Sequence, residues 1–101
     1  MHAAVRRYSV NDAQAFVGKI EDGAFTDRLK EVDGFVGYYV IRGENGDVAT
    51  VTVGETDAAI SKSAELAAEQ VSATASDLVD GSPDVTSGEV LIRAERPWTG
   101  S

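Results

Sequence analysis

Residues 33–54 read DGFVGYYVIRGENGDVATVTVG, and this stretch decides the fold. Asp33-Gly34 indicates a turn, and the run from Phe35 to Arg42 is rich in the β-branched and aromatic residues that favour strands. Asn45-Gly46 accepts the two positive φ angles of a type I′ turn. We therefore expect Asp47 to Val53 to fold straight back as an antiparallel partner strand.

The turn type sets the register of this hairpin. Three opposing pairs follow from a two-residue turn: Tyr38 with Val53, Tyr39 with Thr52 and Val40 with Val51. The same register opposes Glu44 to Asp47, which are two like charges, so a four-residue loop stays open as an alternative.

In this register the two faces of the hairpin differ. One face is apolar enough to lie under helices and carries Val36, Tyr38, Val40, Val51 and Val53. The opposite face carries Phe35, Gly37, Tyr39, Ile41, Thr50 and Thr52. A sheet surface that faces water should alternate with charged residues, and this one does not. We expect it to be covered by the same face of a second copy, because a two-fold contact is self-complementary.

The rest of the chain supplies two more strands and two helices. The expected elements are a strand from Ala4 to Val10, a helix capped by Asn11 that kinks at Glu21-Asp22-Gly23 or restarts near Thr26, a long helix capped by Thr56 from Asp57 to about Val79, and a last strand from about Glu89 to Glu95. The order β-α-β-β-α-β predicts an α+β, ferredoxin-like fold with a four-stranded antiparallel sheet. Two helices can cover only one face of that sheet.

Composition and charge exclude several classes of partner and site. The chain has 101 residues, a formal net charge of −8 and no cysteine, which fits one domain over residues 1–101 without a disulfide or thiolate site. Scattered Lys and Arg argue against nucleic acid and anionic membranes, and no apolar run is long enough to span a bilayer. We expect a cytoplasmic protein. The three lysines reflect either a high-salt source or codon bias toward Arg.

Several short motifs resemble the dimeric α+β barrel superfamily, and most closely its antibiotic-biosynthesis-monooxygenase-like domains. They are Asp33-Gly34-Phe35-Val36-Gly37-Tyr38-Tyr39, the Asn45-Gly46 hairpin, Thr52-Val53 before an Ala- and Ser-rich helix, and Gly88-Glu89-Val90. The resemblance implies a homodimer. Asp33 replaces the proline that commonly opens the second strand, and Gly54 stands where oxygenating or haem-degrading members place an aromatic residue.

The resemblance does not extend to a cofactor. Haem-degrading members need an axial histidine on the second helix, and this helix has none. The only histidine, His2, lies at a terminus that we expect to be mobile. Glu21-Asp22 and the pair Asp77 and Asp80 are expected to be surface charge. We therefore expect neither a cofactor nor a metal site.

The pocket candidates are the residues of the second sheet face. Phe35, Tyr39, Ile41, Thr50 and Thr52 would line an apolar cavity with a few hydroxyls, which suits a small, flat, partly polar ligand. In the alternative, they only fill the barrel and the dimer contact. Tyr38 is expected in the core under the helices.

Two arginines and the tail are weaker candidates. Arg42 and Arg93 could bind an anion at the open end of the barrel, or pair with nearby acids such as Glu44 and Glu95. Residues 96–101 form a tail that is flexible or docks on the partner subunit, with Trp98 as its anchor.

Two functions remain open, and the catalytic residues, if any, are unknown. The first is a dimeric barrel that holds a small, partly apolar molecule or merely assembles. The second is a cofactor-independent monooxygenase that acts on a polycyclic aromatic or quinol substrate, in which the protein supplies desolvation and hydrogen-bond donors. A tyrosine with an ordinary pKa near 10 is a poor base for the second role.

Overall fold

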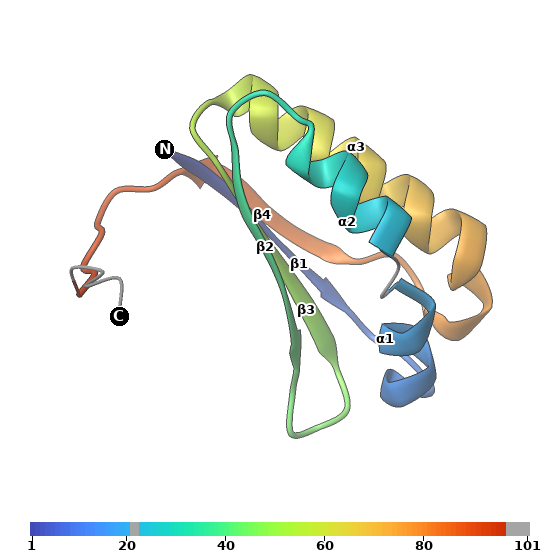
Figure 1. Ribbon diagram of the computed structural model, residues 1–101. Coiled ribbons are helices and arrows are strands. Elements are labelled where there is room, and N and C mark those ends of the chain that lie inside the picture. The colour runs from blue at the N-terminus through green and yellow to red at the C-terminus, as the bar shows by residue number, and fades with distance from the viewer. Residues whose placement is uncertain (21–22, 97–101) are drawn as a thin grey trace.

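The computed structural model describes residues 1–20 and 23–96, and it shows the ferredoxin-like α+β arrangement (Figure 1). The elements are β1 (His2–Tyr8), α1 (Ala13–Ile20), α2 (Gly23–Lys30), β2 (Phe35–Arg42), β3 (Val48–Gly54), α3 (Asp57–Thr74), a 3-10 turn (Ser76–Leu78) and β4 (Asp84–Glu89). The first predicted helix is thus two helices, and the second begins at Gly23, ahead of the expected restart near Thr26.

All four strands pair antiparallel in the order β2-β3-β1-β4. The three helices lie on one side of this sheet, and the opposite side carries no helix (Figure 1). We call these two sides the covered face and the open face. The sheet has β2 at one edge and β4 at the other.

The predicted hairpin is present, but its register differs by one residue. Tyr38 pairs with Thr52 and Tyr39 pairs with Val51. A type I′ turn needs a positive φ at both of its central residues. Gly46 has a φ of 90°, but the φ of Asn45 is not positive, so the turn is not type I′. Gly43 N–H donates to the Asp47 carbonyl at 2.7 Å, which closes a loop of three residues in place of the expected two or the alternative four.

This shift inverts β3, because a slip of one residue moves every side chain to the other face. Thr50 and Thr52 lie on the covered face, only 2% and 4% exposed, and Val51 and Val53 lie on the open face. The expected faces of these four residues were wrong. On β2, Tyr38 and Val40 do face the helices, whereas Tyr39 and Ile41 face away, as expected.

The start of β2 departs from prediction for a different reason. The β2–β3 ladder shifts register between Phe35 and Gly37. Phe35 consequently packs toward Phe25 and Leu29 under the helices, and Val36 is exposed. An extra residue in one strand is a β-bulge, and it reverses the sides on which the residues before it lie.

The core between sheet and helices has two parts. In the first, Tyr8 and Phe16 pack with Ile20, Val48 and Ala75, and the Tyr8 and Phe16 rings lie 5.3 Å apart. In the second, Phe25, Leu29, Leu66 and Ala67 bring α2 and α3 together. The buried alanines of α3 confirm that this helix lies close to the sheet.

Other expected element boundaries were also wrong. The first strand was expected from Ala4 to Val10, and β1 spans His2–Tyr8. α3 ends at Thr74, whose hydroxyl donates to the Gln70 carbonyl, and Ala75 then leaves the helical conformation. A side-chain hydroxyl that competes for a carbonyl in this way weakens a helix. The last strand spans Asp84–Glu89, so the expected strand from Glu89 to Glu95 is displaced toward the N-terminus.

The turn geometry predicts unequal effects for two alanine substitutions. Gly46→Ala places a side chain at a φ of 90°, and we expect it to lower the free energy of unfolding by about 1 kcal/mol or more. Asn45→Ala is expected to change it by less than about 0.5 kcal/mol, because Asn45 has a negative φ and an exposed side chain. Urea denaturation measures both values. Equal losses would indicate the type I′ turn instead.

Candidate functional site

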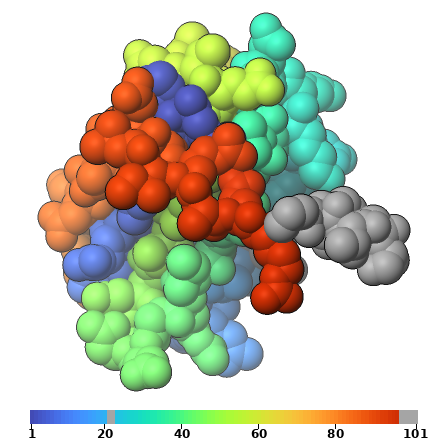
Figure 2. Space-filling model, turned by 90° about the vertical axis from the view of Figure 1, so that its left-hand side faces the viewer, coloured from blue at the N-terminus to red at the C-terminus, as the bar shows by residue number. Residues whose placement is uncertain are grey.

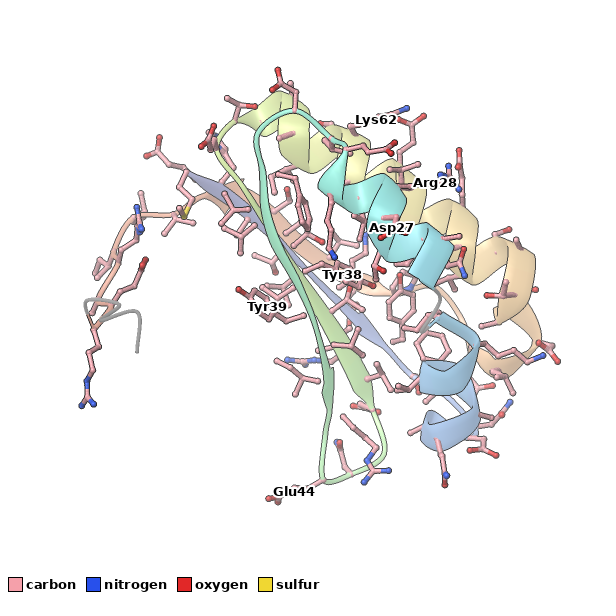
Figure 3. The ribbon with its side chains drawn as sticks, viewed as in Figure 1. Asp27, Arg28, Tyr38, Tyr39, Glu44 and Lys62 are labelled. Carbon is pink, nitrogen blue, oxygen red and sulfur yellow. The ribbon has the colours of Figure 1, made fainter. Side chains whose placement is uncertain are left out.

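The covered face holds a row of polar side chains across three strands. Arg6 of β1 pairs with Thr50 of β3, and Tyr38 of β2 pairs with Thr52, which lies two residues further along β3. The ring of Tyr38 meets the ring of Phe25 edge to face, with centroids 5.5 Å apart. Figure 3 shows Tyr38 on the helix side of β2 and Tyr39 on the opposite side. The expectation that Tyr38 lies under the helices is confirmed.

Burial changes the chemistry of Tyr38. Desolvation raises the pKa of its phenol to about 12, and the neighbouring Tyr8 adds to the rise, whereas a hydrogen bond with Thr50 and the charge of Arg6 oppose it. Tyr38 therefore keeps its proton at neutral pH. It can donate a hydrogen bond to a ligand, but it is not a general base.

A cleft runs along the free edge of β2, between that strand and α2. It has a volume of about 260 Å³, and its lining residues are Thr26, Leu29, Lys30, Phe35, Val36, Gly37, Tyr38 and Tyr39. We call it the β2-edge cleft. Its lining is largely apolar, with the Tyr38 and Tyr39 phenols, the Thr26 hydroxyl and the Lys30 ammonium as polar groups. That combination is typical of sites for small organic molecules.

A second groove continues along the same strand toward the hairpin. It measures about 190 Å³ and is lined by Gln14 and Val17 of α1 with Val40 and Arg42 of β2. Among the described residues, no carboxylate lies within 4 Å of the Arg42 guanidinium, so the expected alternative pairing with Glu44 is not present. Within the described residues, Arg42 therefore has no ion-pair partner and lies beside Val17 and Val40.

The five predicted pocket residues do not share one face. Phe35 and Tyr39 line the β2-edge cleft, Ile41 lies on the open face, and Thr50 and Thr52 lie beneath the helices. The single pocket that we expected from them is therefore divided by the sheet. The cause is the one-residue shift of the hairpin, together with the bulge at the start of β2.

The open face is apolar, as expected, although its residues differ from those predicted. Tyr39 is 58% exposed and Ile41 is 53% exposed, and Val5, Val36, Val51 and Val53 lie on the same face, which also carries Arg7 of β1. Figure 2 views the molecule from this side, with the C-terminal segment in red. A large exposed apolar patch on a small domain marks an interaction site.

The C-terminal segment, residues 90–96, extends away from the sheet without forming a strand (Figure 1). Leu91 and Ile92 are 84% and 88% exposed. Arg93 donates to Glu95 at 2.8 Å, which is the paired alternative to anion binding. Residues 97–101, which include Trp98, lie outside the described residues, as do Glu21 and Asp22.

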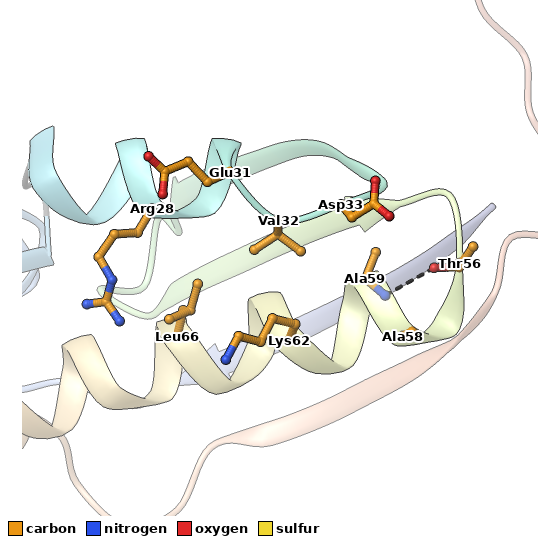
Figure 4. A pocket seen from close by; sticks show the side chains of 9 residues that line it. All are labelled: Arg28, Glu31, Val32, Asp33, Thr56, Ala58, Ala59, Lys62 and Leu66. Carbon is orange, nitrogen blue, oxygen red and sulfur yellow. Dashed lines mark hydrogen bonds between the residues drawn. The ribbon is translucent and has the colours of Figure 1, made fainter.

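A larger groove of about 560 Å³ lies between α2 and α3 on the outside of the helices (Figure 4). Its charged residues have both signs, and its Arg28 already faces Glu69 at 3.6 Å. The Thr56 hydroxyl accepts from the Ala59 amide and caps α3. This groove is a furrow between two packed helices, and we do not assign it a ligand.

Two residues were misjudged or missed in the sequence. His2 belongs to β1, where it pairs with Gly54 and Glu89, so the expectation of a mobile terminus was wrong. Arg6 was not singled out, although its position two residues before the buried Tyr8 places it on the covered face. The period-two pattern of the first strand was the signal that could have found it.

Within residues 1–20 and 23–96, no cluster of three or more His, Asp or Glu side chains could hold a metal ion. In the same residues, no helix combines the length and apolar character needed to cross a bilayer.

Solved structures with this architecture are numerous, although their sequences differ greatly. A dimeric ferredoxin-like protein from an uncultured marine organism superposes with a TM-score of 0.73 at 10% identity, over 95% of this chain and 92% of that one. A monooxygenase of Streptomyces coelicolor, solved with nanaomycin D, gives 0.71 at 19% identity, over 96% and 92%. SnoaB, a cofactor-independent oxygenase of Streptomyces nogalater, gives 0.71 at 12% identity, over 94% and 97%.

The chain has the fold of the antibiotic-biosynthesis-monooxygenase-like proteins. This confirms the fold that the sequence motifs suggested. No protein-family model matches the sequence, and no curated protein matches it significantly. At these identities the likeness concerns the fold alone.

The raised pKa of Tyr38 predicts a loss of stability at alkaline pH. Below pH 10 the phenol is protonated in both folded and unfolded chains, and between pH 10 and about 12 only the unfolded chain releases its proton. We expect this group to lower the free energy of unfolding by about 2 kcal/mol across that interval. Chemical denaturation at several pH values should show a smaller decline for Tyr38→Phe. An equal decline in both proteins would contradict the burial of this phenol.

Proposed function

We propose that the chain forms a homodimer through the open face and that each subunit holds a small, partly apolar molecule in the β2-edge cleft. The observation that carries the proposal is the division of the sheet into two unlike faces. One is covered by helices and carries polar groups beside a cleft, and the other is apolar and has no cover.

The dimer is supported by the exposed apolar side chains. Tyr39 and Ile41 project from β2, and Leu91 and Ile92 project from the C-terminal segment. Burial of apolar surface contributes about 25 cal/mol per Å², and a small domain has little core to spare. A two-fold contact would bury these side chains of both copies at once. One of the solved structures with this fold is itself described as dimeric.

The ligand is inferred from the lining of the cleft. Phe35, Leu29 and the stem of Lys30 offer apolar walls, and the phenols of Tyr38 and Tyr39 offer hydrogen-bond donors. The volume of about 260 Å³ lies just below the common range of about 300–1,000 Å³ for ligand pockets. A small, flat molecule with one acceptor group therefore fits these features best.

The alternative function, cofactor-independent oxygenation, is favoured by one observation: two of the proteins that share the fold are described as a monooxygenase and a cofactor-independent oxygenase. Two features of this chain count against it. The described lining of the β2-edge cleft includes no His, Asp or Glu to act as a base. At Gly54, a Cβ atom would lie 3.1 Å from the Ala59 Cβ, so an aromatic residue there would displace α3.

The dimer is tested by placing a charge on the open face. Tyr39→Glu is expected to convert a dimer into monomers or an unfolded chain, because a carboxylate would be buried in the contact without a partner. Lys62→Glu, on the outer surface of α3, introduces the same side chain far from that face (Figure 3) and should leave the dimer intact. Light scattering at micromolar concentration gives the mass. A monomeric wild-type protein would exclude the proposed dimer.

The ligand site is tested with 1,8-dihydroxyanthrone, a flat molecule with polar oxygens. We expect Tyr38→Phe to weaken binding about 10-fold, the value of one lost hydrogen bond to a ligand. Tyr8→Phe is the matched control, because it removes the same hydroxyl from a tyrosine that is not part of the lining of the cleft. Fluorescence titration measures the dissociation constants. Equal effects of the two variants would place the ligand elsewhere.

The same compound separates binding from oxygenation. An oxygen electrode should record no uptake above the buffer rate if the protein only binds the anthrone. Uptake that depends on the protein, and that falls in Tyr38→Phe, would support the monooxygenase instead.

A further inference from the structure

Another groove lies on the other side of α3 from the β2-edge cleft. It is lined by β1, α3 and the connection that leads to β4, and it measures about 290 Å³. Among the described residues that line it, Arg6 alone carries a formal charge. The other polar side chains are the Ser72 and Ser76 hydroxyls and the Tyr8 phenol. Val71, Val79 and Pro83 make much of the remaining wall apolar. We call this the Arg6 groove.

Arg6 lacks the partner that a covered arginine normally has. Its Nε atom is buried, and no described residue accepts a hydrogen bond from it. Among residues 1–20 and 23–96, no carboxylate lies within 4 Å of the guanidinium. Removing a guanidinium N–H from water without an acceptor costs free energy, which an anion in the groove would recover.

We infer that the Arg6 groove binds a small organic monocarboxylate, with the carboxylate on Arg6 and the apolar part of the ligand against Val71, Val79 and Pro83. A single guanidinium matches a single negative charge, and its planar N–H groups match the two oxygens of a carboxylate. The Ser72 and Ser76 hydroxyls can donate to the same group. A doubly charged anion is disfavoured by the net charge of −8.

This site is separate from the proposed ligand in the β2-edge cleft. The cleft opens at the β2 edge of the sheet, and the Arg6 groove lies toward the β4 edge. The two linings share no residue. A residue of one lining can therefore be replaced while every lining residue of the other stays in place.

Benzoate and its neutral analogue benzamide are the probes, and backbone amide NMR shifts are the readout. Benzoate is expected to shift resonances of residues 71–83, whereas benzamide, which has the same ring but no charge, should not. Arg6→Gln should weaken benzoate binding about 10-fold or more, as expected for a charge-assisted pair. Arg7→Gln is the matched control, because it makes the same change one residue later on the open face.

Three results would overturn the inference. Benzoate could fail to shift residues 71–83, benzamide could bind as well as benzoate, or Arg7→Gln could weaken binding as much as Arg6→Gln. If Arg6 served only to pack its stem, its replacement would change stability and leave benzoate binding unchanged. Arg6→Lys and Ser72→Ala keep the test decisive if Arg6→Gln fails to fold, because both should weaken benzoate binding and leave binding of 1,8-dihydroxyanthrone unchanged.

Discussion

The turn between β2 and β3 determines which side chains of β3 meet the helices. Gly46 adopts a positive φ and Asn45 does not, so the hairpin closes with three residues between Gly43 and Asp47. That loop places Thr50 and Thr52 under α3 and leaves Val51 and Val53 on the open face. A turn of two residues would have exchanged these pairs. The polar character of the covered face and the apolar character of the open face therefore both depend on the conformation of one residue.

Polar groups beneath the helices would be costly if they had no partners. Thr50 interacts with the Tyr38 phenol and opposes the rise of its pKa, and Phe25 packs edge to face on the Tyr38 ring. Arg6 has no such partner in the described chain, and its charge lies close enough to Tyr38 to oppose the rise of that phenol's pKa. Tyr38, at the β2 side, therefore has a polar neighbour, and Arg6, toward β4, has no acceptor among the described residues. For this reason we assign an anion to the Arg6 groove and a neutral, partly apolar molecule to the β2-edge cleft.

Hydrophobic pattern and turn signals were sufficient to predict the order of elements, the helix-covered sheet and the position of Tyr38. They were insufficient for the register, because Asn-Gly suits both a type I′ turn and a three-residue loop, and only backbone angles distinguish them. The predicted pocket failed as a consequence: Thr50 and Tyr39 lie on opposite faces. The last strand was misplaced because Val90, Leu91 and Ile92 look more strand-like than Asp84–Glu89, although only the latter segment pairs with β1. Pairing is a long-range property that local composition does not contain.

The arrangement places one of the two proposed ligand sites next to the proposed dimer contact and the other away from it. A second copy on the open face would contact Tyr39 and Ile41, whereas the β2-edge cleft and the Arg6 groove open on the covered side, at opposite edges of the sheet. Of the residues in these linings, Tyr39 and Val36 also belong to the open face, so the cleft lies nearer to the proposed contact than the groove does. Dimerisation can therefore order one wall of the cleft and leave the Arg6 groove unaffected. A ligand in the cleft would then be linked to the monomer–dimer equilibrium, and an anion in the groove would not.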